Sequence, residues 1–227
     1  KKQKQGDLFY VGVCFAGGRV RGWEIRKLSE LAAKFSAPGL DAIRTTNKQN
    51  LILLNIPESN LEPLLAELRE AGLVYEPSNF RQGCVSCTGI EFCNLAVAET
   101  KNRMIELVGQ LEKRSSHFGE KIRIHFSGCP SSCGQHQIAD IGFRGATRTV
   151  NGVKKEAFDM FLGGKLGSGA KFNTLIQPKV PYEQVDLYVD AILRNYQANR
   201  LDGERFDQFI ARTPKEQLKA VFAPLAA

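Results

Sequence analysis

Two pairs of cysteines have the residue type, spacing and surroundings that metal chemistry needs. Cys87 and Cys93 have five residues between them, and Cys129 and Cys133 have three. Glycine or proline lies beside each pair, and such loops leave backbone N–H groups free to point at sulfur atoms. Iron–sulfur clusters are held by four cysteine thiolates, and N–H bonds to the sulfurs help to set the reduction potential. The spacing therefore favours an iron–sulfur cluster.

Zinc and inert buried thiols are the alternatives that the spacing leaves open. Structural zinc sites commonly use Cys-x2–4-Cys spacings in both halves, and the five-residue gap after Cys87 fits that pattern poorly. Five of the six cysteines fall within residues 84–133, a density that is unusual for inert thiols. Cys84 lies three residues before Cys87 and could form a zinc or redox pair with it. Cys14 lies in an apolar run and is predicted to be a small buried residue.

Composition and charge limit the class of protein. The chain has 227 residues, of which 43% are hydrophobic and 24% are charged, as in ordinary globular domains. It has no run of about 18 apolar residues and no secretory start, so we expect neither a membrane span nor a disulfide scaffold. The net charge of +7 suits an anionic cofactor or an acidic partner, and no nucleic-acid-binding motif accompanies it. The chain begins with lysine, which we interpret as a start inside a longer polypeptide or a trimmed form of one.

Hydrophobic periodicity divides the chain into two α+β units, residues 1–80 and 81–227. In the first unit, the pattern predicts a strand, a helix, two strands and a second helix. These elements span residues 8–15, 23–35, 41–45, 50–56 and 61–71. The order β-α-β-β-α is typical of a ferredoxin-like module.

The second unit begins at the first cysteine pair and must bring the two pairs together. A helix over residues 94–113 and a strand over residues 122–126 are predicted between the pairs. Together they allow the chain to turn back and bring the two cysteine pairs together. Strands are also expected at residues 138–143 and 157–162. Helices are expected over residues 182–197, 206–210 and 215–222.

Four short motifs closely resemble the siroheme-containing nitrite and sulfite reductase family. They are Cys87–Cys93 (CTGIEFC), Glu99–Lys101 (ETK), Ser127–Gln135 (SGCPSSCGQ) and Ala139–Phe143 (ADIGF). The resemblance extends to four further segments and covers nearly the whole chain: Gly17–Arg19, Arg44–Asn50, Phe161–Gly164 and Gly203–Phe206. The closest resemblance is to the C-terminal half of ferredoxin-dependent nitrite reductase. It implies an α+β fold in which a ferredoxin-like module precedes a domain that binds a 4Fe–4S cluster and siroheme.

The resemblance implies roles for residues at matching positions. The cluster would be bound by Cys87, Cys93, Cys129 and Cys133. The last of these, Cys133, would also bridge to the siroheme iron. Thr88, Ser131 and Ser132 are further cofactor-binding candidates because they adjoin these cysteines. The family usually has asparagine where Ser131 stands, so its reach toward the macrocycle differs here.

Siroheme carries many carboxylates, and a basic pocket satisfies them with charge-assisted hydrogen bonds. Arg44, Lys48 and Gln49 are the candidates for this contact by their position in the ferredoxin-like module. The alternative is that this module is a pseudo-symmetric copy that no longer touches the cofactor. Residues 8–15 contain no arginine, although the family's substrate-binding half carries one on this strand. We therefore expect the catalytic basic residues outside this chain, with Arg44 and Lys48 taking that role only in a homodimer.

The activity implied by the resemblance is the six-electron reduction of nitrite to ammonia. The near alternative is reduction of sulfite to sulfide, in one version by a small homodimer. Electrons would come from reduced ferredoxin or a similar acidic donor, and an N-terminal half or a second subunit would complete the site around a small oxyanion. Two interpretations from other classes stay open: a siroheme-free iron–sulfur electron carrier and a zinc-stabilised interaction module. No nucleic-acid or membrane partner is expected, and thiol chemistry predicts a reducing compartment, the cytoplasm or the plastid stroma.

Overall fold

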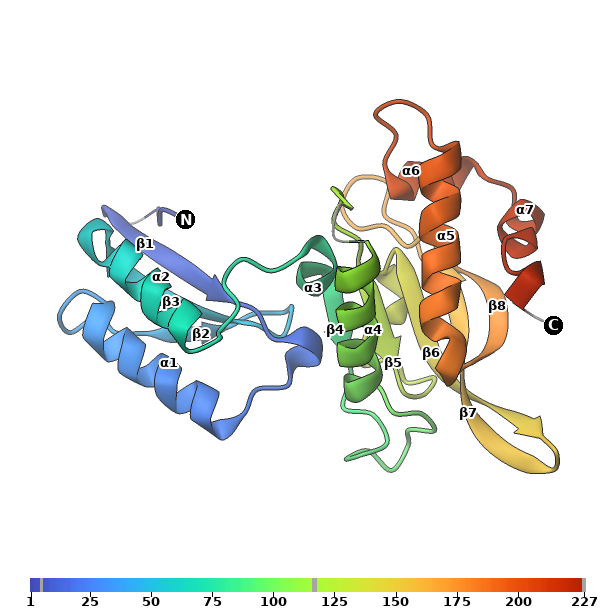
Figure 1. Ribbon diagram of the computed structural model, residues 1–227, viewed down its shortest axis with the longest axis horizontal. Helices are drawn as coiled ribbons and strands as arrows, with labels where there is room; N and C mark the ends of the chain where they lie inside the picture. Colours follow the sequence, from blue (N-terminus) through green and yellow to red (C-terminus); the bar gives the residue numbers. More distant parts are fainter. Residues whose placement is uncertain (5, 116–117, 226–227) are drawn as a thin grey trace.

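The computed structural model describes residues 1–4, 6–115 and 118–225, and its first unit is a three-stranded sheet covered by two helices (Figure 1). The antiparallel strands lie in the order β1-β3-β2: β1 (Leu8–Val13), β2 (Ile43–Thr45) and β3 (Leu51–Pro57). Helices α1 (Gly22–Phe35) and α2 (Leu61–Glu70) bury their apolar stripes against these strands, with Leu28, Leu53 and Leu64 excluded from solvent. The predicted β-α-β-β-α order is confirmed.

The second unit is built on a five-stranded mixed sheet in the order β4-β5-β6-β7-β8. Its strands are β4 (Cys84–Ser86), β5 (Ile124–Ser127), β6 (Ile141–Val150), β7 (Val153–Leu162) and β8 (Thr174–Pro181). Strands β4, β5 and β6 run parallel, whereas β6, β7 and β8 are antiparallel to one another in turn. Parallel neighbours need a crossover connection, and α4 (Lys101–Arg114) supplies it between β4 and β5.

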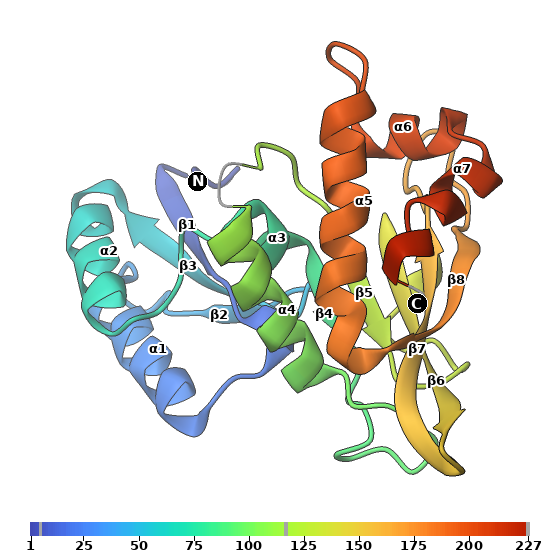
Figure 2. The same ribbon diagram turned by 45° about the vertical axis from the view of Figure 1, so that its right-hand side comes forward.

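Helices cover one face of this sheet, as Figure 2 shows for α4 and α5 (Val185–Asn199). The short helices α3 (Asn79–Gly83), α6 (Phe206–Arg212) and α7 (Lys215–Ala220) complete the unit. Phe126 of β5 stacks on Phe143 in the core below the helices, with 4.6 Å between ring centroids. Because side chains alternate along a strand, His125 points to the opposite face of the sheet from Phe126. Within the described residues, no helix has both the length and the apolar character needed to cross a membrane.

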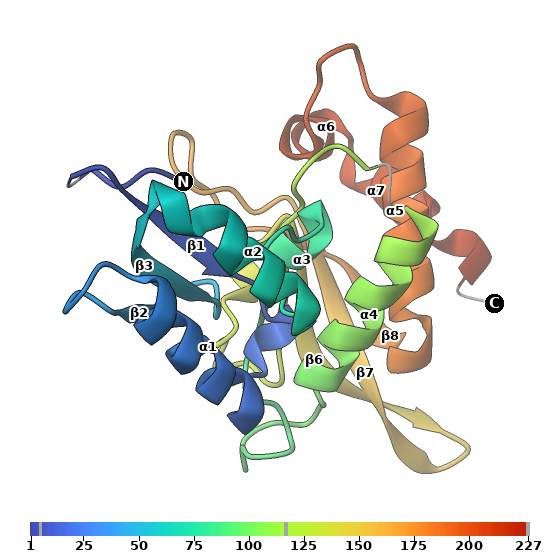
Figure 3. The same ribbon diagram turned by 60° about the vertical axis from the view of Figure 1, so that its left-hand side comes forward.

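Direct hydrogen bonds join the first unit to β4 and to the start of α4, and Figure 3 shows the two units next to each other. The Gln49 amide donates from Nε2 to the Ser86 carbonyl oxygen (2.7 Å) and accepts from the Ser86 N–H (3.0 Å). The Lys101 ammonium donates to the carbonyl oxygen of Gly17 (2.5 Å). Since Cys87 follows Ser86, these bonds hold the start of the first cysteine loop against the ferredoxin-like module.

The helix expected over residues 94–113 begins later, at Lys101, because the residues before it pair with other loops. The Val97 N–H donates to the Gly128 carbonyl oxygen (2.9 Å), and the Ile90 N–H donates to the Ala98 oxygen (3.1 Å). Backbone groups used in this way are not free for the hydrogen bonds of a helix. The prediction was therefore wrong for residues 94–100.

Strand β8 is absent from the elements that periodicity predicts, since Pro178 and Pro181 interrupt its pattern. Proline lacks the N–H that a central strand must donate, but it is tolerated at a sheet edge. Strand β8 is the last in the sheet order and therefore lies at that edge.

Candidate metal centre

Both cysteine loops start where a strand in the parallel part of the sheet ends. Cys87 follows β4 directly, and Gly128 and Cys129 follow β5. The two strands are neighbours, with Ser86 opposite Phe126. Because β4 and β5 are parallel, their carboxyl ends lie at the same edge of the sheet. Loops far apart in the sequence are thereby brought together.

Direct hydrogen bonds join the two loops at this edge. The Gly128 N–H donates to the Cys87 sulfur, with 3.1 Å between N and Sγ, and the Cys87 N–H donates to the Phe126 carbonyl oxygen (3.0 Å). A side chain on Gly128 would be crowded, since its Cβ would lie 3.0 Å from both the Ala96 Cβ and the Ala98 oxygen, closer than ordinary van der Waals contact. The close approach of the loops therefore explains a glycine at this position.

The second loop, Cys129–Gln135, turns tightly and carries two cysteines on one short stretch. The Ser132 N–H donates to the Cys129 carbonyl oxygen (3.4 Å), and the Gln135 N–H donates to the Ser132 oxygen (2.7 Å). Ser132 and Gln135 adopt the left-handed backbone region, with φ values of 61° and 54°. Cys129 is buried, whereas Cys133 is exposed. The Cys133 thiol is thus accessible to a group that binds from outside the chain.

The two loops offer a donor set that suits a cubane cluster. A 4Fe–4S cluster takes four cysteine thiolates, and each binds a different iron, so its ligands stand farther apart than those of one ion. Residues 1–4, 6–115 and 118–225 hold no group of three or more His, Cys, Asp or Glu side chains gathered around a single ion position. The N–H bond to the Cys87 sulfur is of the kind that stabilises cluster-bound thiolates. The chemistry of the four thiols and the direct contact between the two loops fit the cluster, and the assignment of the four cysteines as its ligands stays a prediction.

Cys14 and Cys84 form a separate pair of thiols at the junction of the two units. The Cys84 sulfur lies 3.1 Å and the Cys14 sulfur 3.6 Å from the same oxygen, the carbonyl oxygen of Arg81. Burial raises the pKa of the Cys14 thiol to about 12, and burial also raises the pKa of Cys84. Both thiols are therefore protonated at neutral pH, as is typical of buried, unreactive cysteines.

We expect Cys14 and Cys84 to resist alkylation by iodoacetamide at pH 8 in the folded protein, because only a thiolate reacts. Their raised pKa values leave almost no thiolate at that pH, and for Cys14 reactivity should appear only as the pH approaches about 12. Mass spectrometry of peptides after alkylation, with and without denaturant, measures both sites. Modification of either cysteine at the same rate in both conditions would contradict this expectation.

Three polar residues predicted to contact the cofactors lie in the cysteine loops. Thr88 and Ser131 are exposed, and Ser132 is half-buried. The Ser132 hydroxyl donates to the Pro130 carbonyl oxygen (3.0 Å) and lies 3.2 Å from Nδ1 of His136. Thr88 and Ser131 thus present accessible hydroxyls beside the cysteines, whereas Ser132 braces its own loop. Their contacts with a cofactor stay predictions.

Two buried histidines support the second loop. Nδ1 of His125 lies 3.1 Å from the Gln135 carbonyl oxygen, and the His136 ring packs on Phe161 with 4.9 Å between ring centroids. Burial lowers the pKa of both imidazoles to about 4, and nearby cations add to the effect. Both histidines are therefore neutral at pH 7, and they shape the loop without adding charge to it.

The three candidates for siroheme carboxylates lie on the ferredoxin-like module. Arg44 is exposed on β2. Lys48 is half-buried, and burial together with the positive charge of Lys121 lowers its pKa. The Gln49 amide is bonded at both ends to Ser86. Gln49 therefore has a structural task, and its contact with siroheme stays a prediction, as do those of Arg44 and Lys48.

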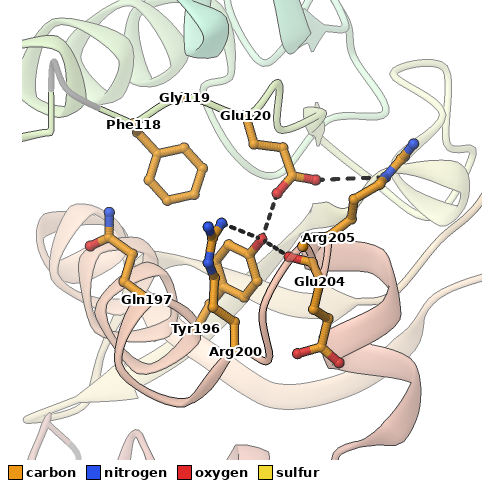
Figure 4. A pocket seen from close by; sticks show the side chains of 9 residues that line it. Phe118, Gly119, Glu120, Tyr196, Gln197, Arg200, Glu204 and Arg205 are labelled. Carbon is orange, nitrogen blue, oxygen red and sulfur yellow. Dashed lines mark hydrogen bonds and ion pairs between the residues drawn. The ribbon is translucent and has the colours of Figure 1, made fainter.

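A cavity of about 620 Å³ is lined by residues 118–120, which precede β5, and by residues of α5 and the loop after it (Figure 4). In its wall, the Glu120 carboxylate accepts from the Tyr196 hydroxyl (2.7 Å) and from the Phe206 N–H (3.1 Å to each oxygen). Arg200 in turn donates to the Tyr196 oxygen (3.3 Å). These polar groups bind one another, so the network anchors the start of α6.

Replacing Glu120 with alanine should lower the free energy of unfolding by about 1–3 kcal/mol, because the buried Phe206 N–H loses its acceptor. Denaturant-induced unfolding measures the change. The matched control is Glu216→Ala, which removes a largely exposed carboxylate of α7. Among the described residues this carboxylate pairs with Lys219 alone, so its loss should cost less than about 0.5 kcal/mol. Equal losses in the two variants would argue against the network.

Family models match both units of the chain. The model described as "Nitrite and sulphite reductase 4Fe-4S domain" matches residues 79–224. The model described as "Nitrite/Sulfite reductase ferredoxin-like half domain" matches residues 1–71. Both descriptions name the family that the cysteine motifs resemble.

Individual relatives agree with these models. The chain is 40% identical over 221 residues to a sulfite reductase (ferredoxin) of Mycobacterium tuberculosis, covering 95% of this chain and 39% of the relative. It is 38% identical over 200 residues to the chloroplastic ferredoxin–nitrite reductase of Zea mays, covering 86% of this chain and 34% of the relative. The solved structure of the M. tuberculosis NirA protein matches with a TM-score of 0.88 and 38% identity, over 96% of this chain and 40% of that one. The chain thus spans 34–40% of the length of these proteins. It belongs to the nitrite and sulfite reductase family, whose cofactors are the 4Fe–4S cluster and the siroheme predicted from the sequence.

Proposed function

We propose that this chain is the cluster- and siroheme-binding part of a reductase that converts nitrite to ammonia with six electrons. The observation that carries the proposal is the meeting of the two cysteine loops at the carboxyl ends of β4 and β5, joined by the N–H bond from Gly128 to Cys87. The proposed cluster ligands are Cys87, Cys93, Cys129 and Cys133. The exposed Cys133 is proposed to be shared with the siroheme iron.

The chain's own part in the reaction is to hold the cofactors and to supply charge around them. When bound, the cluster and siroheme supply one-electron transfer and a macrocycle at which a small oxyanion is reduced. The two loops fix the positions of the four thiolates, and Thr88 and Ser131 offer exposed hydroxyls beside them. Arg44 and Lys48 offer positive charge on the proposed ferredoxin-like module, residues 1–80, whose Gln49 binds Ser86 of the proposed cluster domain, residues 81–227.

The basic residues that bind the oxyanion are proposed to come from outside this chain. Strand β1 contains no arginine or lysine, and the chain spans about 40% of the length of the M. tuberculosis sulfite reductase it resembles. A further part of a longer polypeptide, or a second subunit, would then complete the site. Reduced ferredoxin is the proposed electron donor, supported by the names of the relatives and by a net charge of +7 that would steer an acidic donor.

Sulfite is the second candidate substrate. The M. tuberculosis sulfite reductase matches with 40% identity over 95% of this chain, against 38% over 86% for the maize nitrite reductase. Both substrates are small oxyanions, and both reductions consume six electrons. The same cysteine loops would therefore serve either reaction.

The test uses the whole protein that contains this chain, purified without oxygen and supplied with reduced ferredoxin. Visible absorption, iron and acid-labile sulfide report the cofactors, while ammonium formed from nitrite and sulfide formed from sulfite report the reaction. A higher kcat/KM for nitrite than for sulfite supports the proposal. A higher kcat/KM for sulfite overturns nitrite as the substrate and identifies sulfite in its place. A cluster without siroheme bands and without either product would identify an electron carrier, and zinc without acid-labile sulfide would overturn the whole assignment.

A further inference from the structure

The hydroxyl of Thr100 is directed at the first cysteine, from a residue thirteen positions away in the sequence. Thr100 immediately precedes α4 and is completely buried. Its Oγ1 donates to the carbonyl oxygen of Cys87 (2.7 Å) and lies 3.7 Å from the Cys87 sulfur. One side-chain hydroxyl therefore contacts both the backbone and the thiol of a proposed cluster ligand.

The hydroxyl is not occupied by the helix that it precedes. Threonine at this position ordinarily caps a helix by accepting from its first N–H groups. Here the Glu99 carboxylate accepts from the N–H groups of Lys101 (3.1 Å), Asn102 (2.8 Å) and Arg103 (3.1 Å), and Thr100 makes no capping bond. Since Glu99 satisfies the helix, the Thr100 hydroxyl is left to act on Cys87.

Packing holds the hydroxyl in place. Gly89 approaches so closely that a Cβ there would lie 2.6 Å from Oγ1 of Thr100, and its backbone has a φ of 74° that favours glycine. The Gly128 N–H donates to the Cys87 sulfur. Cys87 is thus held at its sulfur by one backbone N–H and at its carbonyl oxygen by one hydroxyl that is buried from solvent.

We propose that Thr100 is a positioning residue. By donating to the Cys87 carbonyl oxygen, its hydroxyl holds Cys87 where the sulfur accepts from the Gly128 N–H, and it thereby raises the reduction potential of the cluster. The Thr100 hydroxyl has one hydrogen and donates it to the Cys87 carbonyl oxygen, so the donor to the cluster-bound sulfur is the Gly128 N–H. A donor near sulfur stabilises the more negative, reduced cluster. The inference rests on the proposed assignment of Cys87 as a cluster ligand.

The experiment compares Thr100→Val, which removes the hydroxyl at nearly constant shape, with Thr100→Ser, which keeps it. The reduction potential is measured by titration followed by electron paramagnetic resonance on the whole protein with its cofactors. We expect a more negative potential in Thr100→Val and the parent value in Thr100→Ser. The control Val108→Ala loses a buried methyl pair on α4, so it should unfold more easily while keeping the parent potential.

Each outcome decides the proposal. An unchanged or more positive potential in Thr100→Val, or an equal shift in Val108→Ala, would overturn it. If Thr100→Val assembles no cluster, a cluster in Thr100→Ser supports the positioning role. Loss of the cluster in both variants overturns it, because the hydroxyl that serine keeps then does not suffice. The parent protein is measured first, since a parent without cluster signals would refute the proposed function, whereas a parent cluster with an insensitive Thr100 refutes only this inference.

Discussion

Replacing Cys133 with serine should remove siroheme from the protein and lower the rate of oxyanion reduction at least about 100-fold, more than is typical for a residue that only supports a metal ligand. The expectation follows from the placement of Cys133 on the tight second loop with its thiol exposed, where the proposed function gives it both the cluster and the siroheme iron. Serine keeps the size of the side chain but lacks the soft thiolate that iron–sulfur clusters use. Visible absorption, iron content and steady-state rates measure the effect.

Cys84 is the matched control for this substitution. It is a cysteine in the same domain, but its thiol is buried beside the Arg81 carbonyl oxygen, and burial raises its pKa. The Cys84→Ser variant should therefore keep the cluster, the siroheme bands and most of the activity. Retention of siroheme and full rate in Cys133→Ser, or loss of the cluster in Cys84→Ser, would contradict the assignment of ligands.

Replacing Gly134 with alanine should destabilise the folded protein by about 3 kcal/mol or more and prevent cluster assembly. A Cβ on Gly134 would lie 1.9 Å from the Phe126 carbonyl oxygen, far inside contact distance. That oxygen is held by the Cys87 N–H at 3.0 Å, so relief of the clash would pull apart the bond that joins the first loop to β5. Unfolding in denaturant, together with iron content after purification, measures both consequences.

Replacing Gly109 with alanine is expected to have the opposite effect on stability. It lies inside α4, and a Cβ there would meet no atom within 4 Å. Because alanine favours helix more than glycine does, Gly109→Ala should stabilise the protein by up to about 1 kcal/mol. A stable, cluster-containing Gly134→Ala variant would show that the second loop can move away from β5, contrary to the geometry described above.

The fold of the first unit was largely predictable from its sequence. Apolar residues repeat with helical spacing around Leu28 and Leu64, and with strand spacing around Leu53, so local pattern and final packing agree. The local pattern and the structure disagree where a backbone group forms its hydrogen bond with a distant part of the chain. Residues 94–100 have helix-forming composition, but the Val97 N–H is taken by Gly128 of the other cysteine loop, and no local pattern reports that contact.

The candidate site divides in the same way. An iron–sulfur cluster was favoured by the sequence alone, because such clusters are held by four cysteine thiolates and cysteines are visible in a sequence. The cysteines concerned are Cys87, Cys93, Cys129 and Cys133. The structural role of Gln49 could not be predicted from the sequence. Its amide binds the backbone of Ser86, and a bond to backbone atoms leaves no trace in the partner's residue type. The contact of Thr100 with Cys87 was also hidden, because Glu99–Lys101 was recognised only as a motif and a threonine before a helix ordinarily indicates a cap.

The sequence by itself determined which residues can offer thiolates, the family to which the chain belongs, and the order of the helix and the strand between the two cysteine pairs. Only the tertiary structure decided which groups surround each sulfur. It placed the Gly128 N–H and the Thr100 hydroxyl at Cys87, and it enclosed Cys84 beside Arg81. The physical reason is that residue type sets what an atom can donate or accept, whereas distance and burial, which set the strength of each interaction, come from strands and loops that meet only after the chain has folded.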